Sequence, residues 1–294
     1  MENKRTKILV SLAALSIGVI GLVIFLQPIT IETDTQEIAS QEENLLAQSA
    51  PPVLSNPKSS PQIRAAGAYL MTNGEPLYAL GDKKVWPIAS ITKLMTAFVA
   101  RQVIEPTEEI VIGKEAVAAF GDVGEFGVGE KFKADDLVKA MLISSSNDAA
   151  KALAMHYGEA EFVSEMNKVT REIGMSNTNF VDSAGLSPRN LSTANDIGIL
   201  VRAIWASDPE IFAITRLPTT TIVDIDKGRS RKLYNTNIFA GRRDFLGGKT
   251  GQIPDSEGNL VSIFQVPLKS SPVIIVILGA EDRFKETEKI LKEL

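Results

Sequence analysis

The hydrophobic and polar positions divide the chain into an apolar N-terminal run, a polar stretch and a long segment of mixed pattern. Residues 8–26 form the apolar run, which contains no charged residue. At about 1.5 Å per residue, a helix of this length spans roughly 28 Å, close to the ~30 Å thickness of a bilayer interior, and it lacks the polar face of a core helix. The run therefore predicts an uncleaved transmembrane anchor, with later cleavage near LLAQSA (45–50) as the alternative.

The charges on either side of this run set the expected orientation. Lys4, Arg5 and Lys7 precede the run and acidic residues follow it. Residues 1–7 should therefore remain in the cytoplasm, and the rest of this single-pass protein should lie on the outer side of the cell membrane. Residues 27–62 are rich in Pro, Gln, Ser and Glu and show no hydrophobic period, which predicts a flexible tether.

The remaining pattern predicts one domain that mixes strands and helices. Two short apolar runs flank an Asn-Gly turn at 73–74, which is a strong β-hairpin signal. NLVSIFQV (259–266) and SPVIIVILGA (271–280) give a second pair of strands, and an amphipathic helix follows them. The pattern between the two pairs is mostly helical. We therefore expect a mixed α/β (α+β) domain over residues 63–294, with one sheet assembled from both ends and a helical insert.

Composition narrows the chemistry that this domain can perform. The 294 residues carry a formal charge of −5 at pH 7, which argues against nucleic acid as a partner. The chain has no Cys and one His, His156, which lies in a helical pattern with no serine motif nearby. These facts disfavour thiol catalysis, a histidine-activated serine and a His- or Cys-based metal site. We expect no cofactor and no metal.

A serine precedes a lysine by three positions at Ser90 and Lys93, at the start of a helical pattern. Residues i and i+3 share one face of a helix, so the lysine amine can reach the serine hydroxyl. A neutral lysine can act as a base, but its pKa must fall by about 3 units, roughly 4 kcal/mol, through burial and a second positive charge. The same spacing recurs at Ser55 and Lys58 in the tether, so the motif alone is weak.

Two further motifs follow in order along the chain. SSN (145–147) lies on or beside a helix start, within a mostly helical pattern over residues 133–158. KTG (249–251) leads into a predicted strand. A chance K-T-G is uncommon in a chain of this length and composition. The three motifs in this order are therefore specific, although each one separately is not.

The ordered motifs resemble those of the penicillin-recognising serine acyltransferases, a group that includes penicillin-binding proteins and serine β-lactamases. The surrounding sequence is most similar to the serine-type D-alanyl-D-alanine carboxypeptidases, in phrases such as PIASITKLMTA, FVDSAGLSPRNLSTANDIGILVRA and YNTNIFAGRRDFLGGKTG. This similarity covers nearly all of residues 64–280. It implies a β-lactamase/transpeptidase-like fold, in which helices flank an antiparallel sheet of about five strands and form a helical subdomain.

The resemblance also implies roles for the catalytic residues. Ser90 would attack the D-Ala-D-Ala bond of a peptidoglycan stem peptide and become acylated, and Lys93 would take its proton. Ser145 would relay a proton to the leaving D-alanine, and Asn147 would hold Lys93 or the substrate amide. β-Lactam antibiotics would acylate the same serine as inhibitors.

The substrate-binding residues implied by the resemblance lie on one strand: Lys249, Thr250, Gly251 and Gln252. Lys249 would supply the positive charge that keeps Lys93 neutral. With Thr250 it would bind the terminal carboxylate of the substrate. The backbone N–H groups of Gln252 and of the nucleophile would hold the oxyanion.

The sequence departs from the family pattern in three places. QIPDSEGN (252–259) follows K-T-G where a sequence containing Thr and Ala-Gly would be expected, and Ser146 stands where Gly is common. We also expect this protein to lack the extra β domain and C-terminal amphipathic anchor that many relatives carry. We expect the N-terminal helix to replace that anchor.

Three alternative functions share these motifs. A D,D-endopeptidase that cleaves peptidoglycan cross-links belongs to the same family. A class A β-lactamase needs a glutamate in an E-x-x-L-N phrase, and no glutamate between Asn147 and Lys249 begins one. A penicillin-binding sensor without turnover would be expected to carry a longer cytoplasmic region than residues 1–7.

Overall fold

The computed structural model describes residues 63–117 and 126–294. The sequence-predicted anchor (8–26) and tether (27–62) lie outside the described residues, so both stay predictions. Within the described ranges, none of the helices combines the length and apolar character needed to cross a bilayer.

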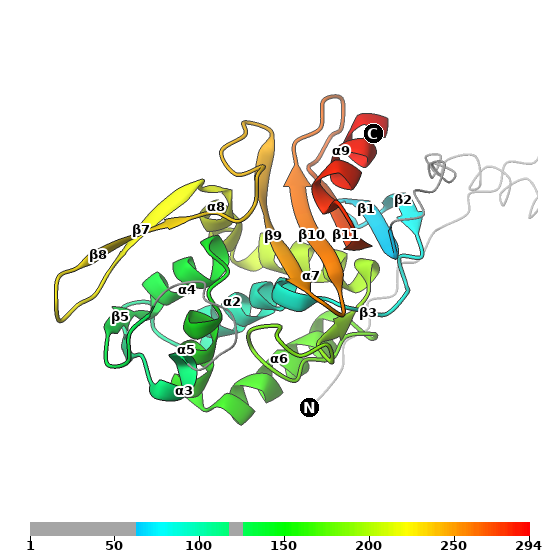
Figure 1. The fold of residues 1–294 in the computed structure, drawn as a ribbon. Helices are drawn as coiled ribbons and strands as arrows, with labels where there is room; N and C mark the ends of the chain where they lie inside the picture. Colours follow the sequence, from blue (N-terminus) through cyan, green and yellow to red (C-terminus); the bar gives the residue numbers. More distant parts are fainter. Residues whose placement is uncertain (1–62, 118–125) are drawn as a thin grey trace, which may run out of the picture. The chain divides into compact units, whose positions relative to one another are not determined.

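A five-stranded antiparallel sheet forms the centre of the described domain (Figure 1). The strand order is β2-β1-β11-β10-β9, so the N-terminal hairpin pairs with the C-terminal strands, with Gly67 opposite Val276. This arrangement confirms the fold class expected from the sequence. The five strands are β1 (Ala65–Leu70), β2 (Pro76–Leu80), β9 (Phe245–Ile253), β10 (Glu257–Phe264) and β11 (Val273–Ala280).

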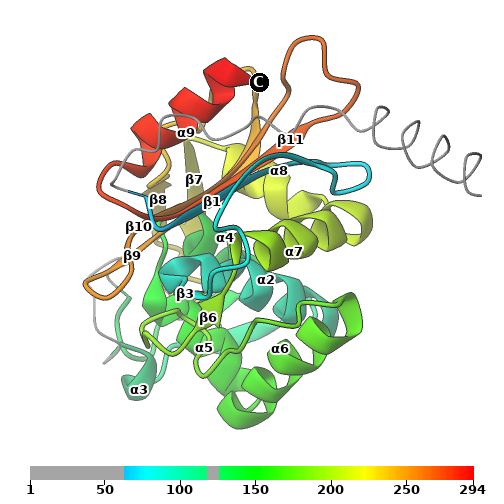
Figure 2. The same cartoon turned by 90° about the vertical axis from the view of Figure 1, so that its right-hand side faces the viewer.

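Strand β11 is buried on both faces of the sheet. Alternate residues, beginning at Val273, join the apolar cluster beneath helix α9 (Arg283–Glu293). The residues between them join the larger cluster with helices α2 (Thr92–Val103) and α7 (Ala194–Ser207). Figure 2 shows α9 on one side of the sheet and these two helices on the other. A strand covered on both faces needs a continuous apolar run, which is the pattern of VIIVIL.

The helical pattern expected over residues 133–158 is interrupted in the structure at residues 144–146. Ser145 adopts a φ of +63°, which no right-handed helix allows. The Ser146 hydroxyl then accepts a hydrogen bond from Ala149 N (3.2 Å) and caps the next helix. The interruption therefore yields two helices, α4 and α5, and α5 begins at Asn147, where SSN indicated a helix start. The helices not yet named are α3 (Lys114–Val117), α4 (Ala134–Ile143), α5 (Asn147–Tyr157), α6 (Glu159–Ile173) and α8 (Glu210–Arg216).

Among residues 63–117 and 126–294, three two-stranded ribbons accompany the central sheet. The first ribbon pairs Trp86 with Ser192, so it ties the segment just before Ser90 to the segment before α7. The ribbons are β3 (Trp86–Pro87) with β6 (Leu191–Ser192), β4 (Glu109–Val111) with β5 (Lys131–Lys133), and β7 (Thr219–Val223) with β8 (Ser230–Tyr234).

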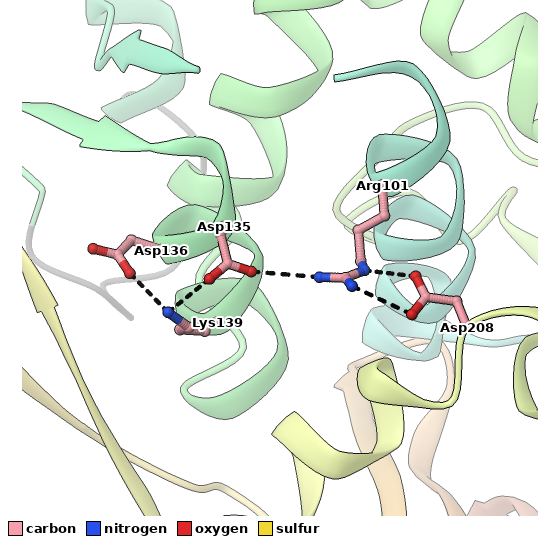
Figure 3. Close-up of polar contacts among 5 residues, drawn as sticks. All are labelled: Arg101, Asp135, Asp136, Lys139 and Asp208. Carbon is pink, nitrogen blue, oxygen red and sulfur yellow. Dashed lines mark hydrogen bonds and ion pairs between the residues drawn. The ribbon is translucent and has the colours of Figure 1, made fainter. Parts of the chain in front are cut away.

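An ion network joins the C-terminal end of α2 to the N-terminal end of α4 (Figure 3). Arg101 on α2 donates to Asp208 through Nε (2.6 Å) and Nη2 (3.3 Å), and its Nη1 lies 3.4 Å from Asp135 Oδ1 on α4. Lys139 Nζ extends the network, at 2.7 Å from Asp135 Oδ2 and 3.0 Å from Asp136 Oδ1. The network fixes the two helices at the ends remote from Ser90 and Ser144.

Replacing Arg101 with Met should lower the free energy of unfolding by about 1 to 3 kcal/mol, because it removes the guanidinium from two partly buried carboxylates. Urea unfolding followed by circular dichroism measures the change. Lys168→Met breaks an ion pair with Glu165 in which the lysine is half exposed, and it should leave the free energy of unfolding nearly unchanged. Equal losses in the two variants would contradict a structural role for the network.

Candidate active site

Ser90 lies in a short 3₁₀ helix, η1 (Ala89–Ile91), which leads directly into α2. The chain enters this turn through Ala89, whose φ of +49° is unusual for a residue with a Cβ atom. Just before the turn, Ile88 N donates to Asn190 O (3.0 Å). Tertiary contacts therefore hold the Ser90 hydroxyl at the start of α2, where free N–H groups and the helix dipole favour a developing negative charge.

Lys93 is fully buried, and its amine contacts three oxygen atoms. Nζ lies 2.9 Å from Ser90 Oγ, 2.8 Å from Asn147 Oδ1 and 2.5 Å from Ala184 O. Burial lowers the pKa of Lys93 to about 7, against the opposing effect of the Asp182 charge. A neutral amine can donate its two N–H groups to the amide and carbonyl oxygens, which leaves its lone pair for the Ser90 proton. This arrangement suits Lys93 as a base.

The interruption between α4 and α5 places Asn147 next to Lys93 and Ser145 next to Lys249. Asn147 is the first residue of α5 and points its amide oxygen at Lys93. Ser145 precedes it in the left-handed conformation and receives a hydrogen bond from Lys249 Nζ (2.9 Å). Ser146 has a φ of −56° and caps α5, so the position that is often Gly in the family accepts Ser here without strain.

The second lysine, Lys249, extends from β9 and is almost fully buried. Besides Ser145, its amine donates to Thr250 O (3.0 Å). Burial lowers the pKa of Lys249 well below its ordinary value, and the charges of Lys93 and Arg283 lower it further. Because the two lysines repel each other when both are charged, they titrate as a pair. One lysine can therefore serve as a base while the other retains the charge, although burial has the larger effect at both.

A cleft of about 580 Å³ opens beside these residues. Gly251 of β9 forms part of its wall, and a Cβ atom at this position would lie 2.8 Å from Ile88 O and 3.2 Å from Ser90 N. Because Gly251 has no Cβ atom, the edge of β9 can approach the turn that carries Ser90 (Ala89–Ile91), here called the nucleophile turn. The polar residues that line the cleft are Ser90, Ser144, Ser145, Asn147, Thr236, Thr250, Gln252, Asp255 and Arg283.

The structure brings together all eight residues proposed from the sequence. The cleft also contains four polar residues that were not proposed, Ser144, Thr236, Asp255 and Arg283, and two of these contact the proposed residues. Thr236 Oγ1 lies 2.7 Å from Thr250 Oγ1, where either hydroxyl can donate. Arg283, at the start of α9, donates from Nη1 to Gln252 Oε1 (2.8 Å) and to Gly251 O (3.3 Å). In the sequence, Thr236 is one residue of a long phrase similar to the family, and Arg283 is one residue of the closing amphipathic helix. No local motif distinguished either residue as part of the site.

His156, Trp86 and Asn235 do not line the cleft and have structural partners instead. His156 on α5 lies with its Nε2 2.7 Å from Glu108 Oε1. Trp86 donates from its ring nitrogen to Ser256 O (2.9 Å). Asn235 donates to the Thr215 and Leu217 carbonyls (both 2.8 Å), which fixes the loop that carries Thr236. In the described part of the chain, no group of three or more His, Cys, Asp or Glu side chains is arranged to hold a metal.

Comparison with known proteins connects this geometry to one family. A family model described as D-alanyl-D-alanine carboxypeptidase matches residues 55–282. The D-alanyl-D-alanine endopeptidase of Pseudomonas aeruginosa is 31% identical over 238 residues, which cover 76% of this chain and 74% of that protein. The D-alanyl-D-alanine carboxypeptidase DacC of Escherichia coli is 33% identical over 229 residues, which cover 71% of this chain and 55% of that protein.

Solved structures agree with the sequence comparison. Penicillin-binding protein D2 from Listeria monocytogenes, in its cefotaxime-bound form, is 31% identical with a TM-score of 0.70. The superposition covers 81% of this chain and 98% of that one. The matched region of the family model contains every strand of the central sheet and every polar cleft residue except Arg283.

Proposed function

This chain belongs to the D-alanyl-D-alanine carboxypeptidase family, and on that premise we propose that it is a serine peptidase that removes the terminal D-alanine from peptidoglycan pentapeptide stems. The observation that carries the proposal is the environment of Lys93. Its buried amine, with a pKa of about 7, contacts the Ser90 hydroxyl. A serine becomes a strong nucleophile when such a base is within hydrogen-bond distance.

Acylation begins when Ser90 Oγ attacks the carbonyl carbon of the penultimate D-alanine and its proton passes to Lys93. The backbone N–H groups of Ser90 and Gln252 hold the negative oxygen that develops. Ser145, which is hydrogen-bonded to Lys249, passes its proton to the amine of the terminal D-alanine. The proton that Lys93 took from Ser90 then replaces the proton lost by Ser145, so Lys93 is neutral again before water attacks. The C–N bond then breaks, the terminal D-alanine leaves, and the remaining peptide is an ester on Ser90.

Deacylation reverses the proton transfers with water as the nucleophile. Water attacks the ester carbonyl, and Lys93 takes the water proton in the same way that it took the serine proton. The bond to Ser90 Oγ breaks, the oxygen regains a proton, and the shortened peptide is released with a new carboxylate. The step consumes one water molecule and restores the enzyme.

The carboxylate of the terminal D-alanine fits the positive, hydroxyl-lined end of the cleft. The Lys249 amine donates to the backbone carbonyl of Thr250, and the Thr236 hydroxyl is hydrogen-bonded to the Thr250 hydroxyl. The Arg283 guanidinium lines the same cleft. Two hydroxyl donors and a guanidinium are groups that bind a carboxylate well. We assign the recognition of the substrate terminus to these residues.

A second candidate is cleavage of D,D cross-links, because the Pseudomonas aeruginosa relative at 31% identity is named an endopeptidase. The chemistry at Ser90 would be unchanged, and only the leaving amine would differ. In a cross-link that amine belongs to the side chain of another stem peptide rather than to free D-alanine. The leaving-group end of the cleft would then have to accept a larger group.

β-Lactams are the expected inhibitors of this site. The solved structure of the Listeria monocytogenes relative is a cefotaxime-bound form. A β-lactam carbonyl would acylate Ser90 as the peptide does, and the ring-opened product stays attached because no separate amine departs. The chain lacks the E-x-x-L-N glutamate of class A β-lactamases, so we expect slow release of the drug.

We further propose that residues 8–26 anchor the protein in the cell membrane with the peptidase domain outside. The support is the uncharged apolar run and the three basic residues before it. Peptidoglycan lies on that side of the membrane, so the orientation brings the cleft to its substrate. Protease added to intact spheroplasts should digest the domain but spare residues 1–7.

The full-length protein should release D-alanine from a pentapeptide that ends in D-Ala-D-Ala, detected with a D-amino acid oxidase assay. Cross-linked muropeptide dimers in a parallel reaction distinguish the second candidate. Faster cleavage of the dimers than of the pentapeptide would favour the endopeptidase. Labelling by a fluorescent penicillin without turnover of either peptide would contradict both and favour a sensor.

A further inference from the structure

The loop at residues 182–187, here called the Asp182 loop, is built around one carboxylate. Asp182 Oδ1 accepts hydrogen bonds from the backbone N–H groups of Ala184 (2.8 Å), Gly185 (2.5 Å) and Leu186 (3.3 Å). Its Oδ2 accepts a fourth from Ser187 N (2.8 Å). Four N–H groups directed at one carboxylate fix the path of the whole loop.

This loop lies against the first turn of α2. Its Ala184 carbonyl accepts the hydrogen bond from Lys93 Nζ (2.5 Å). Its Ser183 carbonyl accepts one from Thr96 Oγ1 (2.6 Å), one turn further along the helix. Both carbonyls point at α2 because the Asp182 carboxylate draws the following N–H groups to the other side of the loop.

The contact with the nucleophile turn leaves no spare room. Gly185 has a φ of +80°, and a Cβ atom there would lie 2.0 Å from Ala89 O, directly before Ser90. On the far side, Asn190 Nδ2 bonds Asp182 O (3.0 Å). The Asp182 loop is therefore held by Ala89 on one side and by Asn190 on the other. These contacts fix the position of the Ala184 carbonyl.

The charge of Asp182 also acts on Lys93. It raises the pKa of Lys93 and so opposes the larger effect of burial. Lys249 from β9 lies close enough for the charges of the two lysines to repel each other, and Arg283 from α9 acts on Lys249 in the same sense. The Asp182 charge thus favours a proton on Lys93, whereas burial disfavours one.

We propose that Asp182 is a positioning residue for the catalytic base, acting on Lys93 through the Ala184 carbonyl and through its own charge. The inference rests on the proposed role of Lys93 in acylation. By accepting one N–H of the amine, the carbonyl helps direct the lone pair toward Ser90 Oγ. The carboxylate charge keeps the amine basic enough to take the serine proton. Nothing in the S-x-x-K, S-x-N and K-T-G motifs indicates this residue.

The test is the pH dependence of acylation by a fluorescent penicillin in the full-length Asp182→Asn protein. Asparagine keeps one carbonyl oxygen for the Oδ1 contacts, but it removes the charge and turns an N–H donor toward Ser187 N. We expect the acylation rate to reach a lower plateau at high pH. The fall in rate on the acidic side of the profile, here called the acid limb, should be displaced to lower pH. At pH 6 the variant should keep about two- to threefold more of its own plateau rate than the wild type keeps.

Asp224→Asn is the matched control. Asp224 also fixes a turn through its carboxylate, which accepts from Asp226 N (3.0 Å) and Lys227 N (3.1 Å). That turn connects β7 and β8 and does not line the cleft. This variant should leave both the plateau and the acid limb unchanged. Each profile is scaled to its own plateau, so a loss of folded protein does not move its midpoint.

A second variant separates charge from position. Asp182→Glu keeps the charge but displaces the carboxylate by one methylene, so it should lower the plateau with an acid limb near that of the wild type. An Asp182→Asn profile that coincides with the wild type would overturn the proposal, as would equal displacement of the limb in the Asn and Glu variants. Absence of labelling in the wild type would instead overturn the proposed function.

Discussion

Replacing Ser90 with Ala should abolish labelling of the protein by a fluorescent penicillin, with a loss in acylation rate on the order of 10⁴-fold or more. The reason is that Ser90 Oγ is the hydroxyl that touches the Lys93 amine, at 2.9 Å. Ser145 is the other hydroxyl of the motifs near the lysines, and it receives its hydrogen bond from Lys249 instead. Removing Ser90 leaves the cleft and the two lysines in place but no nucleophile. Gel fluorescence after a fixed exposure measures the effect.

The chain supplies its own control for this experiment. Ser55 and Lys58 repeat the S-x-x-K spacing, but they lie outside the described residues and in the predicted tether. Ser55→Ala should label as fast as the wild type. Persistent labelling of Ser90→Ala, or loss of labelling in Ser55→Ala, would refute the assignment of the nucleophile.

Replacing Lys93 with Arg should slow acylation on the order of 10³-fold, about 4 kcal/mol in the barrier. Arginine keeps the positive charge but does not release its proton in proteins. The wild-type pKa of about 7 means that the neutral base forms as the pH rises through 7. The wild-type rate should therefore increase over that range and fall below it, and this limb should vanish in the variant. Stopped-flow acylation from pH 5 to pH 9 tests both expectations.

The larger guanidinium must fit a fully buried site, so a second variant is needed to separate chemistry from packing. Lys93→Met has nearly the same shape without a base, and it should lose activity while its thermal unfolding midpoint stays close to that of the wild type. Lys168→Arg, on the surface of α6, should change neither property. Acylation of both Lys93 variants at the wild-type rate would refute a lysine base.

The sheet could be predicted from the sequence because its signals are local. The Asn-Gly turn at 73–74 indicates the first hairpin, and the apolar run of β11 indicates a strand covered on both faces. The order of the strands is not local information. Nothing in the run of β11 specifies that it lies between β1 and β10, since an apolar strand can pair with any neighbour of suitable length.

The site could be predicted in part for the same reason. Ser90 and Lys93 are one helical turn apart, so their contact follows from helix geometry. Burial of Lys93 does not, because it depends on Asn147 and Ala184, which come from other parts of the chain. Arg283 reaches the cleft from a helix that looked only amphipathic in sequence. Such residues have no signature until the fold brings them together.

The break between α4 and α5 could be predicted in part, because SSN indicated a helix start, although the apolar pattern does not show where α4 ends. The segment over residues 133–158 has a mostly helical pattern of apolar residues, and serine is tolerated inside helices. Ser145 nevertheless has a φ of +63°, which ends the regular helix there. The break is nevertheless what allows Ser145 to face Lys249 and Asn147 to face Lys93.

Two glycines contact the nucleophile turn, and because of them covalent labelling by penicillin should report whether the domain has folded completely. Gly185 meets Ala89 from the Asp182 loop, and Gly251 meets Ile88 and Ser90 from strand β9. One comes from the middle of the chain and the other from its last fifth, so the turn acquires its shape only when both segments have docked. A chain in which either segment is detached should bind no drug covalently even if α2 is intact. The labelled fraction of a refolding sample should therefore count completed molecules and omit partly structured ones.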